Sequence, residues 1–240
     1  MKRDIFLLLA CLCVLICVSW LDQRQADEPV SAVSGPERTW TLILDAGHGG
    51  EDGGASTAAG KRESDINLAI VLKTRALMAF LGVEPRLTRH TDISIHSDGA
   101  ETIRQKKVSD LKNRVALVEN TPNALLISVH QNHFTDPRYS GAQVFFQSDD
   151  MSRQWGEDTQ EVLRQILAPG NDRRAKPMPD GIYLFDHISC PAILVECGFL
   201  SNGEEAALLC TDSYQQKVAV GLAGAYFNEL QKIPTTLGGE

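Results

Sequence analysis

A glycine-rich stretch with a single histidine is the first part of the sequence that could do chemistry. It spans Asp45–Ala55, reads DAGHGGEDGGA, and contains His48. Neither common phosphate-binding pattern fits. Asp52 stands where the dinucleotide pattern after Gly47 and Gly49 needs a glycine, and no Gly-x4-Gly-Lys-Ser/Thr run occurs. The glycines instead predict a low loop that lets a bulky polymer approach a metal ion bound by the histidine.

Three further polar residues stand where strands or helices are expected to begin or end. Glu63 follows His48 by fifteen residues at the start of a predicted helix, His130 ends the apolar run LLISV, and Glu196 lies within ILVEC. Strand ends of this kind face the ligand in α/β sheets. Two histidines and one carboxylate with an open fourth position are a common catalytic zinc set, and a further glutamate can act as general base and then general acid.

Each of these residues also has an ordinary structural explanation. A histidine in a glycine loop can be a turn residue, and Glu63 after Lys61 and Arg62 can be an exposed carboxylate at a helix start. Glu196 is the most informative, because a carboxylate within an apolar strand is costly to bury unless it is paired or bound to a metal. No compact HExxH motif is present, so spacing alone leaves a metal site and a structural role open.

The elements that must position these residues alternate between strand and helix. We predict strands at 40–44, 83–89, 125–129, 143–147, 182–185 and 193–197. We predict helices at 66–81, 103–119, 154–167 and 214–230. Ser64 and Asp65 are expected to cap the first helix, and Gly82 to end it. The alternation predicts a single layered α/β domain without internal repeats.

Apolar spacing predicts which side of the first two helices faces the core. In the first helix the predicted core face consists of Leu68, Leu72, Ala76 and Ala79. In the second helix it consists of Val108, Leu111, Val115 and Val118.

The composition is that of a globular protein: 43% of the 240 residues are hydrophobic and 22% are charged. The net charge of −8 and the lack of a basic run exclude a nucleic-acid partner. At the N-terminus, Lys2 and Arg3 precede an uncharged apolar run over residues 5–21. We assign residues 1–21 to a signal peptide or an N-terminal membrane anchor, and both place the domain outside the cytoplasm.

The rest of the chain divides into a linker, a domain and a tail. Residues 22–38 are polar with Pro, Ser and Gly and form the predicted linker, residues 39–232 the domain, and residues 233–240 a frayed tail. Three of the six cysteines lie in the apolar run, which leaves Cys190, Cys197 and Cys210. Three cysteines do not make a disulfide framework, although one disulfide with one free thiol stays open.

Four sequence blocks occur in order: LILDAGHGGEDGGA, RESDINL, LLISVHQNHF and ILVECGFLSN. In order and separation they resemble the zinc-dependent N-acetylmuramoyl-L-alanine amidase family called amidase_3, over residues 40–230. The resemblance implies a mixed, mostly parallel sheet flanked by helices on both faces. It implies that His48, Glu63 and His130 bind one zinc ion per chain and that Glu196 is the catalytic carboxylate. Peptidoglycan glycan strands with their stem peptides are the implied partner.

A finer resemblance is to the CwlD-type sporulation amidases. It is carried by the short chain, the N-terminal hydrophobic segment, GIYL at 181–184 and RQKKVSDLKNR at 104–114. It implies work on spore cortex peptidoglycan, where removal of stem peptides precedes muramic-δ-lactam formation and germination. It also implies export to the cell wall or the intermembrane space of a developing spore. The 65 residues between His130 and Glu196 leave no room for a built-in plug helix, so we expect control by a regulatory protein of unknown identity.

Several neighbours of these residues are predicted to support them. Ser128 and Asn132 are expected to orient the second histidine or the substrate, and Gly49 and Gly50 to form the low wall beside the metal. His133 and His187 are expected in loops that line the cleft. Two other functions stay open: a zinc peptidase or carboxypeptidase that cuts within the stem peptide, and a non-catalytic wall-binding regulator.

Overall fold

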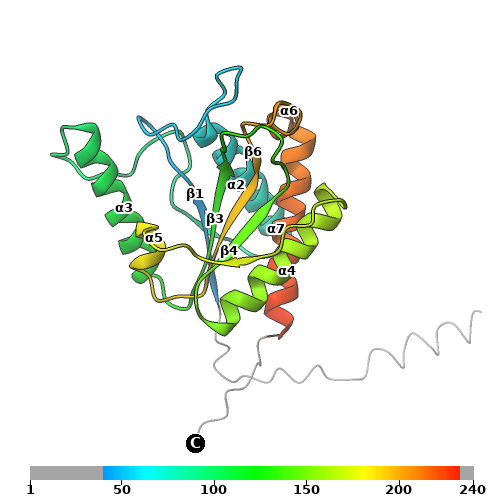
Figure 1. Cartoon of the computed structure of the whole chain (residues 1–240). Coiled ribbons are helices and arrows are strands. Elements are labelled where there is room, and N and C mark those ends of the chain that lie inside the picture. Colours follow the sequence, from blue (N-terminus) through cyan, green and yellow to red (C-terminus); the bar gives the residue numbers. More distant parts are fainter. Residues whose placement is uncertain (1–39, 233–240) are drawn as a thin grey trace, which may run out of the picture. The chain divides into compact units, whose positions relative to one another are not determined.

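The computed structural model describes residues 40–232, and a six-stranded sheet forms the centre of this part of the chain (Figure 1). The strands lie in the order β2-β1-β3-β6-β4-β5. Their bounds are β1 (Thr41–Ala46), β2 (Arg86–Leu87), β3 (Ala124–Asn132), β4 (Gln143–Phe146), β5 (Lys176–Pro177) and β6 (Ala192–Phe199). All neighbours are parallel except β4 and β6. The sheet is therefore mixed and mostly parallel, as predicted.

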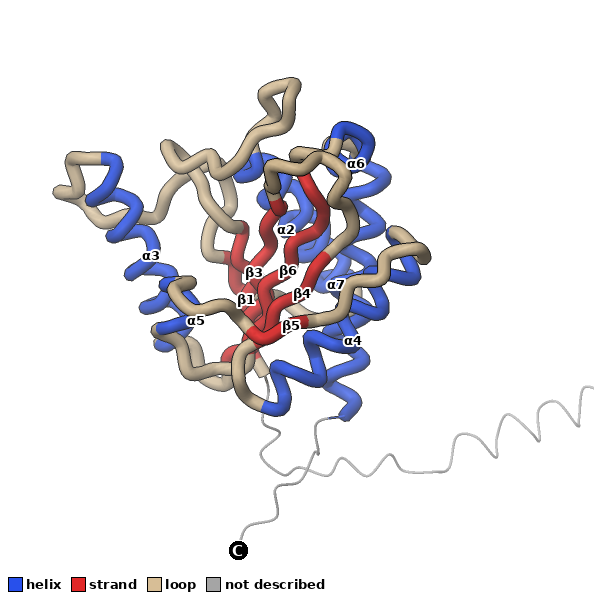
Figure 2. Tube along the Cα trace, in the orientation of Figure 1, coloured by secondary structure: helices blue, strands red, loops and turns tan. Residues whose placement is uncertain are grey.

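Helices cover both faces of this sheet, which confirms the predicted α/β architecture (Figure 2). On one face lie α2 (Glu63–Phe80), α4 (Asp150–Leu167) and α7 (Asp212–Lys232). On the other lie α3 (Ile103–Glu119) and α5 (Tyr183–Asp186). Alternate strand residues supply the two cores, because successive side chains of a strand point to opposite faces. Among the described residues, no helix has both the length and the apolar character needed to cross a membrane.

Two short helices differ from the prediction. The segment 182–185 was expected to be a strand, but it forms α5, which buries Leu184 and Phe185 against the α3 side of the sheet. A run of four apolar residues fits either a strand or a buried helical turn, so periodicity could not decide. The helix α6 (Gly203–Leu209) was not predicted, although the side chain of Asn202 caps it by accepting from the backbone N–H of Glu205 at 3.0 Å. The expected segments 1–21, 22–38 and 233–240 lie outside the described residues.

The start of α2 is also different. The helix begins at Glu63 rather than at residue 66, and neither Ser64 nor Asp65 caps it. Backbone carbonyls of the glycine loop take the place of a cap: Ala55 accepts from the N–H of Glu63 at 2.8 Å, and Gly53 from the N–H of Ser64 at 3.1 Å. The loop and the helix start are thus one hydrogen-bonded unit. Gly82 follows the helix end with φ +85°, as a terminating glycine does.

The predicted core faces of α2 and α3 hold only in part: Val118 is buried, and Leu68 and Val115 are partly buried against the core. In α2 the buried apolar residues are Ile66, Ile70, Val71 and Met78, whereas Leu72 is 36% exposed. In α3 the buried residues are Asp110, Arg114 and Val118, and Val108 is 44% exposed. The inner side of α3 thus carries two charged residues beside Val118, so the helix holds polar groups and also packs against the apolar core on its face of the sheet.

The carboxyl ends of β1, β3 and β6 meet at one edge of the sheet because the three strands are parallel. In this register Ala46 pairs with Val129, and His130 pairs with Glu196. The loop after β1 carries His48 to the same edge. The strand register thus brings two of the predicted site residues together, the loop after β1 adds His48, and the start of α2 supplies the fourth.

Candidate metal centre

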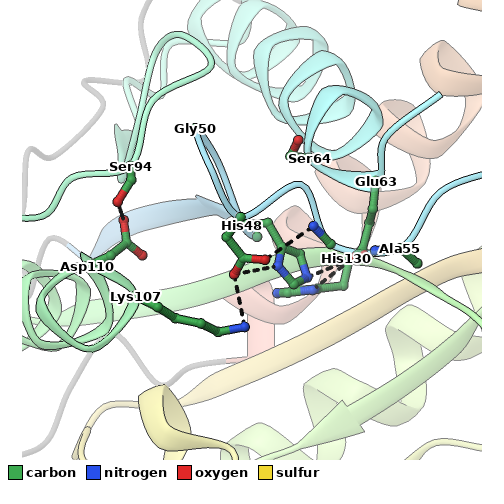
Figure 3. A network of polar contacts seen from close by, with 12 residues as sticks. His48, Gly50, Ala55, Glu63, Ser64, Ser94, Lys107, Asp110 and His130 are labelled. Atoms are coloured by element: carbon green, nitrogen blue, oxygen red, sulfur yellow. Dashed lines mark hydrogen bonds and ion pairs between the residues drawn. The ribbon is translucent and has the colours of Figure 1, made fainter. Parts of the chain in front are cut away.

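Two histidines and one glutamate converge at this edge (Figure 3). Oε1 of Glu63 lies 3.2 Å from Nε2 of His48 and 3.1 Å from Nδ1 of His130. The three candidate ligand atoms all lie within 4.8 Å of one another. The residues come from the loop after β1, the first turn of α2 and the end of β3, so the fold itself assembles them.

These donors fit a zinc ion. A His2Glu set with a further open position is a common catalytic zinc arrangement, and both nitrogens here point at one carboxylate. Burial lowers the pKa of His48, but its hydrogen bonds to Asp52 and Glu63 outweigh burial and raise that pKa to about 9. Burial raises the pKa of Glu63, but its bonds to His130 and His48 lower it far more. The carboxylate thus provides the negative charge that a divalent cation needs.

Three N–H groups hold the Glu63 carboxylate in place. Oε2 accepts from the backbone N–H of Ala55 at 3.0 Å, and Oε1 accepts from that of Gln131 at 3.1 Å. The side chain of Asn67, one turn further along α2, donates to Oε1 at 3.3 Å. The carboxylate also lies in the first turn of α2, where the helix dipole favours negative charge. Its position is therefore fixed before any metal binds.

Asp52 supports His48 and was not predicted as a site residue. Its Oδ2 lies 3.1 Å from Nδ1 of His48, which leaves Nε2 for the metal, and 3.1 Å from Nζ of Lys107 on α3. A carboxylate on the second nitrogen fixes the tautomer and orientation of a metal-binding histidine. Its position four residues after His48, within the same loop, is the sequence feature that could have indicated this role. His48 itself has φ +62°, a left-handed conformation at the turn of that loop.

Several glycines of the loop are packed so closely against other residues that a side chain would not fit. A Cβ on Gly47 would lie 2.2 Å from Nε2 of His130, and one on Gly54 would lie 2.5 Å from Oε2 of Glu63. Gly49 and Gly50 have positive φ, and added Cβ atoms would meet backbone atoms of residues 93 and 94 at 2.3 and 2.8 Å. These glycines are therefore needed for packing within the protein, and their predicted role as a low wall for the substrate stays a prediction.

A buried ion-pair cluster underlies the loop. Arg114 is 2% exposed and bonds to both Asp45 and Asp110, and its Nη2 donates to the backbone oxygen of His48 at 2.7 Å. Burial raises the pKa of Asp45, but the guanidinium lowers it overall. The hydroxyl of Ser128 donates to Asp45 at 2.6 Å, so this serine orients the aspartate. We had expected it to orient the second histidine or the substrate. The cluster fixes the end of β1 and the backbone of the first ligand.

Glu196 faces a cavity of about 510 Å³ that opens beside the three ligands. His48, His130, Asn132 and Glu196 line it, and so do apolar residues of α3 and of the segment around α5. Oε2 of Glu196 is buried and has no hydrogen-bond partner among the described residues. Burial raises the pKa of this carboxyl group to about 7. An orphaned buried carboxyl group that lines a cavity beside metal ligands is a candidate general base.

The remaining predicted neighbours lie as follows. Cys197 is buried in the core on the opposite face from Glu196, as strand alternation requires. His133 is exposed, and His187 stacks on Tyr183 with ring centroids 4.1 Å apart. Neither histidine belongs to the metal group found among residues 40–232. Cys190, Cys197 and Cys210 are all unpaired.

A His2Glu group beside a buried glutamate, at the carboxyl edge of a parallel sheet, is the arrangement of a metal-dependent hydrolase. The chain belongs to the Amidase_3 family, N-acetylmuramoyl-L-alanine amidase, whose model matches residues 42–227. The germination-specific N-acetylmuramoyl-L-alanine amidase of Bacillus subtilis (strain 168) is 36% identical over 180 residues, which are 74% of this chain and 74% of that protein.

Solved structures agree with this assignment. The CwlD amidase from Clostridioides difficile, in complex with the GerS lipoprotein, matches with a TM-score of 0.77 and 39% identity over 81% of this chain and 100% of that one. The catalytic domain of CwlV, an N-acetylmuramoyl-L-alanine amidase from Bacillus (Paenibacillus) polymyxa var. colistinus, matches with a TM-score of 0.66 and 27% identity over 80% and 99%. The resemblance to CwlD-type amidases is therefore confirmed.

Proposed function

We propose that this chain hydrolyses the amide between the lactyl group of N-acetylmuramic acid and the L-alanine of the peptidoglycan stem peptide, with one zinc ion. The observation that carries the proposal is Glu196, a buried carboxyl group with one unpartnered oxygen beside the His48, Glu63 and His130 group. Family membership supports the reaction, and the donor set supports the metal.

The site residues have separate roles in this reaction: metal binding, proton transfer and orientation of a ligand. His48, Glu63 and His130 would hold the zinc ion, which when bound supplies a Lewis acid for the amide carbonyl and for water. Glu196 accepts a proton from the attacking water and then donates it to the nitrogen of the departing alanine. In the metal-free site burial raises the pKa of this carboxyl group to about 7, so the group can hold a proton between the two steps. Asp52 keeps His48 in one tautomer throughout.

The surroundings of the ligands support a polymeric substrate. The side chains of His48 and His130 keep 21% and 22% of their surface exposed, so the described residues leave both ligands open to solvent. Of the helices between β3 and β6, α4 packs on the opposite face of the sheet, and α5 lies along the cavity.

We further propose a role in spore cortex maturation, outside the cytoplasm, under control of a protein partner. The germination-specific relative supports the role, and the lipoprotein bound to the C. difficile CwlD amidase supports a partner of similar kind. The charged start and apolar run of residues 1–21 support export, by a cleaved signal or by membrane attachment through residues 5–21.

The position of the cut tests this function against its rivals. Peptidoglycan digested with the zinc-loaded protein should release stem peptides that begin with L-alanine and should leave muramic acid without peptide. Muramic acid that still carries L-alanine would favour a zinc peptidase or carboxypeptidase. Binding of peptidoglycan without any cut, with zinc present, would favour a wall-binding regulator.

A further inference from the structure

Two aromatic rings stand exposed on the loop between β3 and β4. Phe134 is 50% exposed and Tyr139 is 46% exposed. Their ring centroids lie 5.0 Å apart with planes at 85°, so the two rings form an open corner, called here the aromatic corner. Aromatic side chains left on a surface cost hydration free energy, and where they cluster they often mark a binding site.

The loop that carries the aromatic corner is held rigidly. The N–H of Phe134 donates to the hydroxyl of Ser201 at 3.1 Å, and the side chain of Asn202 donates to the carbonyl of Pro137 at 2.9 Å. At the loop end, the N–H of Gly141 donates to the buried carboxylate of Glu205 at 2.8 Å. These bonds fix both ends and the middle of the loop, so the rings are presented in one arrangement and lose little entropy when a ligand binds.

An arginine supports the corner from below. The guanidinium of Arg173 lies 4.7 Å from the ring centre of buried Phe199 and 5.7 Å from that of Tyr139. Its Nε donates to the carbonyl of Ser140 at 3.0 Å. Tyr139 and Phe199 are themselves stacked, with centroids 6.2 Å apart. The exposed tyrosine thus rests on a packed layer and cannot fold inward to hide its ring.

The aromatic corner adjoins the catalytic edge of the sheet. Asn132 lines the cavity beside the metal ligands, and Phe134 follows two residues later. Two residues of extended chain span about 7 Å, so the corner lies next to the cavity. Phe199, in the layer below, is three residues after Glu196 on β6. A polymer bound at the reacting amide therefore has the corner within reach of its neighbouring units.

We propose that the aromatic corner binds a pyranose ring of the glycan strand, next to the sugar whose amide is cut; this rests on the amidase function proposed above. The C–H face of a pyranose ring is apolar and flat, and it matches one aromatic face while the second ring closes the side. The exposed hydroxyl of Thr135 offers a hydrogen bond to hydroxyl or acetamido groups at the rim, and Arg138 keeps Nη1 for one, because Asp136 already accepts from its Nε and Nη2.

A glycan fits this surface better than a protein partner does. A stable protein interface buries about 1,000 Å² or more, and two half-exposed rings on a short polar loop supply a small part of that. One sugar ring needs only a patch of this size. The continuity with Asn132 also ties the corner to the substrate that enters the cavity.

Two substrates that contain the same scissile amide test the proposal. One is a single muramoyl sugar with its stem peptide, and the other is a glycan oligomer that carries the same peptide. For Phe134→Ala and Tyr139→Ala we expect KM on the oligomer to rise at least about fivefold, with kcat within about twofold. Neither parameter should change on the single sugar. Phe134→Trp should retain the wild-type KM, and Phe134→Leu, which is apolar but not flat, should not.

Phe80→Ala is the matched control. Phe80 is 86% exposed at the far end of α2, which spans about 27 Å from Glu63 over 18 residues. This variant should resemble the wild type on both substrates. An unchanged KM on the oligomer in the corner variants, or equal losses on both substrates, would overturn the proposal. So would corner variants that cut the oligomer normally but no longer bind a purified protein partner.

The proposal can fail separately from the amidase function. If the wild-type protein cut neither substrate, the amidase function would fail. Equilibrium binding of peptide-free glycan oligomers to the wild-type chain and to the corner variants would then still decide the sugar site. Loss of that binding in Phe134→Ala but not in Phe80→Ala supports the site, and equal binding refutes it.

Discussion

Without metal, the stability of Glu196→Gln relative to that of the wild type should increase as the pH rises. The carboxyl group of Glu196 has a pKa raised by burial from 4.5 to about 7. Below pH 4.5 it is protonated in both the folded and the unfolded chain. Between pH 4.5 and 7 the unfolded chain releases this proton while the folded chain keeps it, so the free energy of unfolding falls as the pH rises. Glutamine has a similar shape and no such proton.

The size of the effect follows from the two pKa values. Each pH unit between them is worth about 1.4 kcal/mol, so the full interval corresponds to about 3 kcal/mol. Between pH 5 and pH 8, the free energy of unfolding of Glu196→Gln minus that of the wild type should increase by about 2.5 kcal/mol. Above pH 8 the difference should stay constant, because Glu196 is then ionised in both states.

Urea unfolding at pH 5, 6, 7 and 8 in the presence of a chelator measures this difference. The control is Glu101→Gln, which makes the same substitution at an exposed carboxylate that does not line the cavity. A Glu196→Gln difference that did not change with pH would contradict the burial of this carboxyl group. The reasoning would also be refuted if the variant became less stable than the wild type as the pH rose.

Three other substitutions test how the metal centre is held. Asp52→Asn should weaken zinc binding roughly 10- to 100-fold in a competition titration, because the second nitrogen of the first histidine loses its carboxylate. Gly47→Ala should abolish zinc binding by pushing a Cβ into the ring of His130, whereas Gly170→Ala, with open space around it, should bind zinc normally. Arg114→Met should lower the free energy of unfolding by about 3–5 kcal/mol in urea, because two buried aspartates lose their partner, and unchanged stability would contradict the account of that cluster.

Strand and helix patterns marked the four residues of the candidate metal centre for a physical reason, and the resemblance to the amidase_3 family was needed to assign their roles. His130 and Glu196 each occur at or near the end of an apolar strand, and parallel strands bring such positions to one edge. Glu63 opens a helix, and His48 stands in a loop whose glycines have no phosphate pattern. The same strand–helix alternation predicted the α/β architecture correctly.

Most of the supporting residues could not be predicted, because their partners are distant in the sequence; the exception is Asp52, which lies four residues after its partner His48. The apolar spacing of α3 suggested an amphipathic helix, yet Asp110 and Arg114 turn inward, where Arg114 bonds both to Asp110 and to Asp45, 69 residues before it. Strand and helix are equally compatible with the four residues of 182–185, and only packing against the sheet decides between them. Glycine packing against metal ligands likewise depends on contacts that no local pattern contains.

The most direct test of the proposed mechanism combines metal content and cleavage in one preparation. Peptidoglycan is incubated with wild-type protein, chelated or zinc-loaded, and with zinc-loaded Glu196→Gln, and released peptides are identified by mass spectrometry. We predict one zinc per chain in both loaded proteins, L-alanine-initiated stem peptides from the loaded wild type alone, and none from the chelated protein or the variant. Release at the wild-type rate by zinc-loaded Glu196→Gln, or by the chelated wild type, would contradict the account.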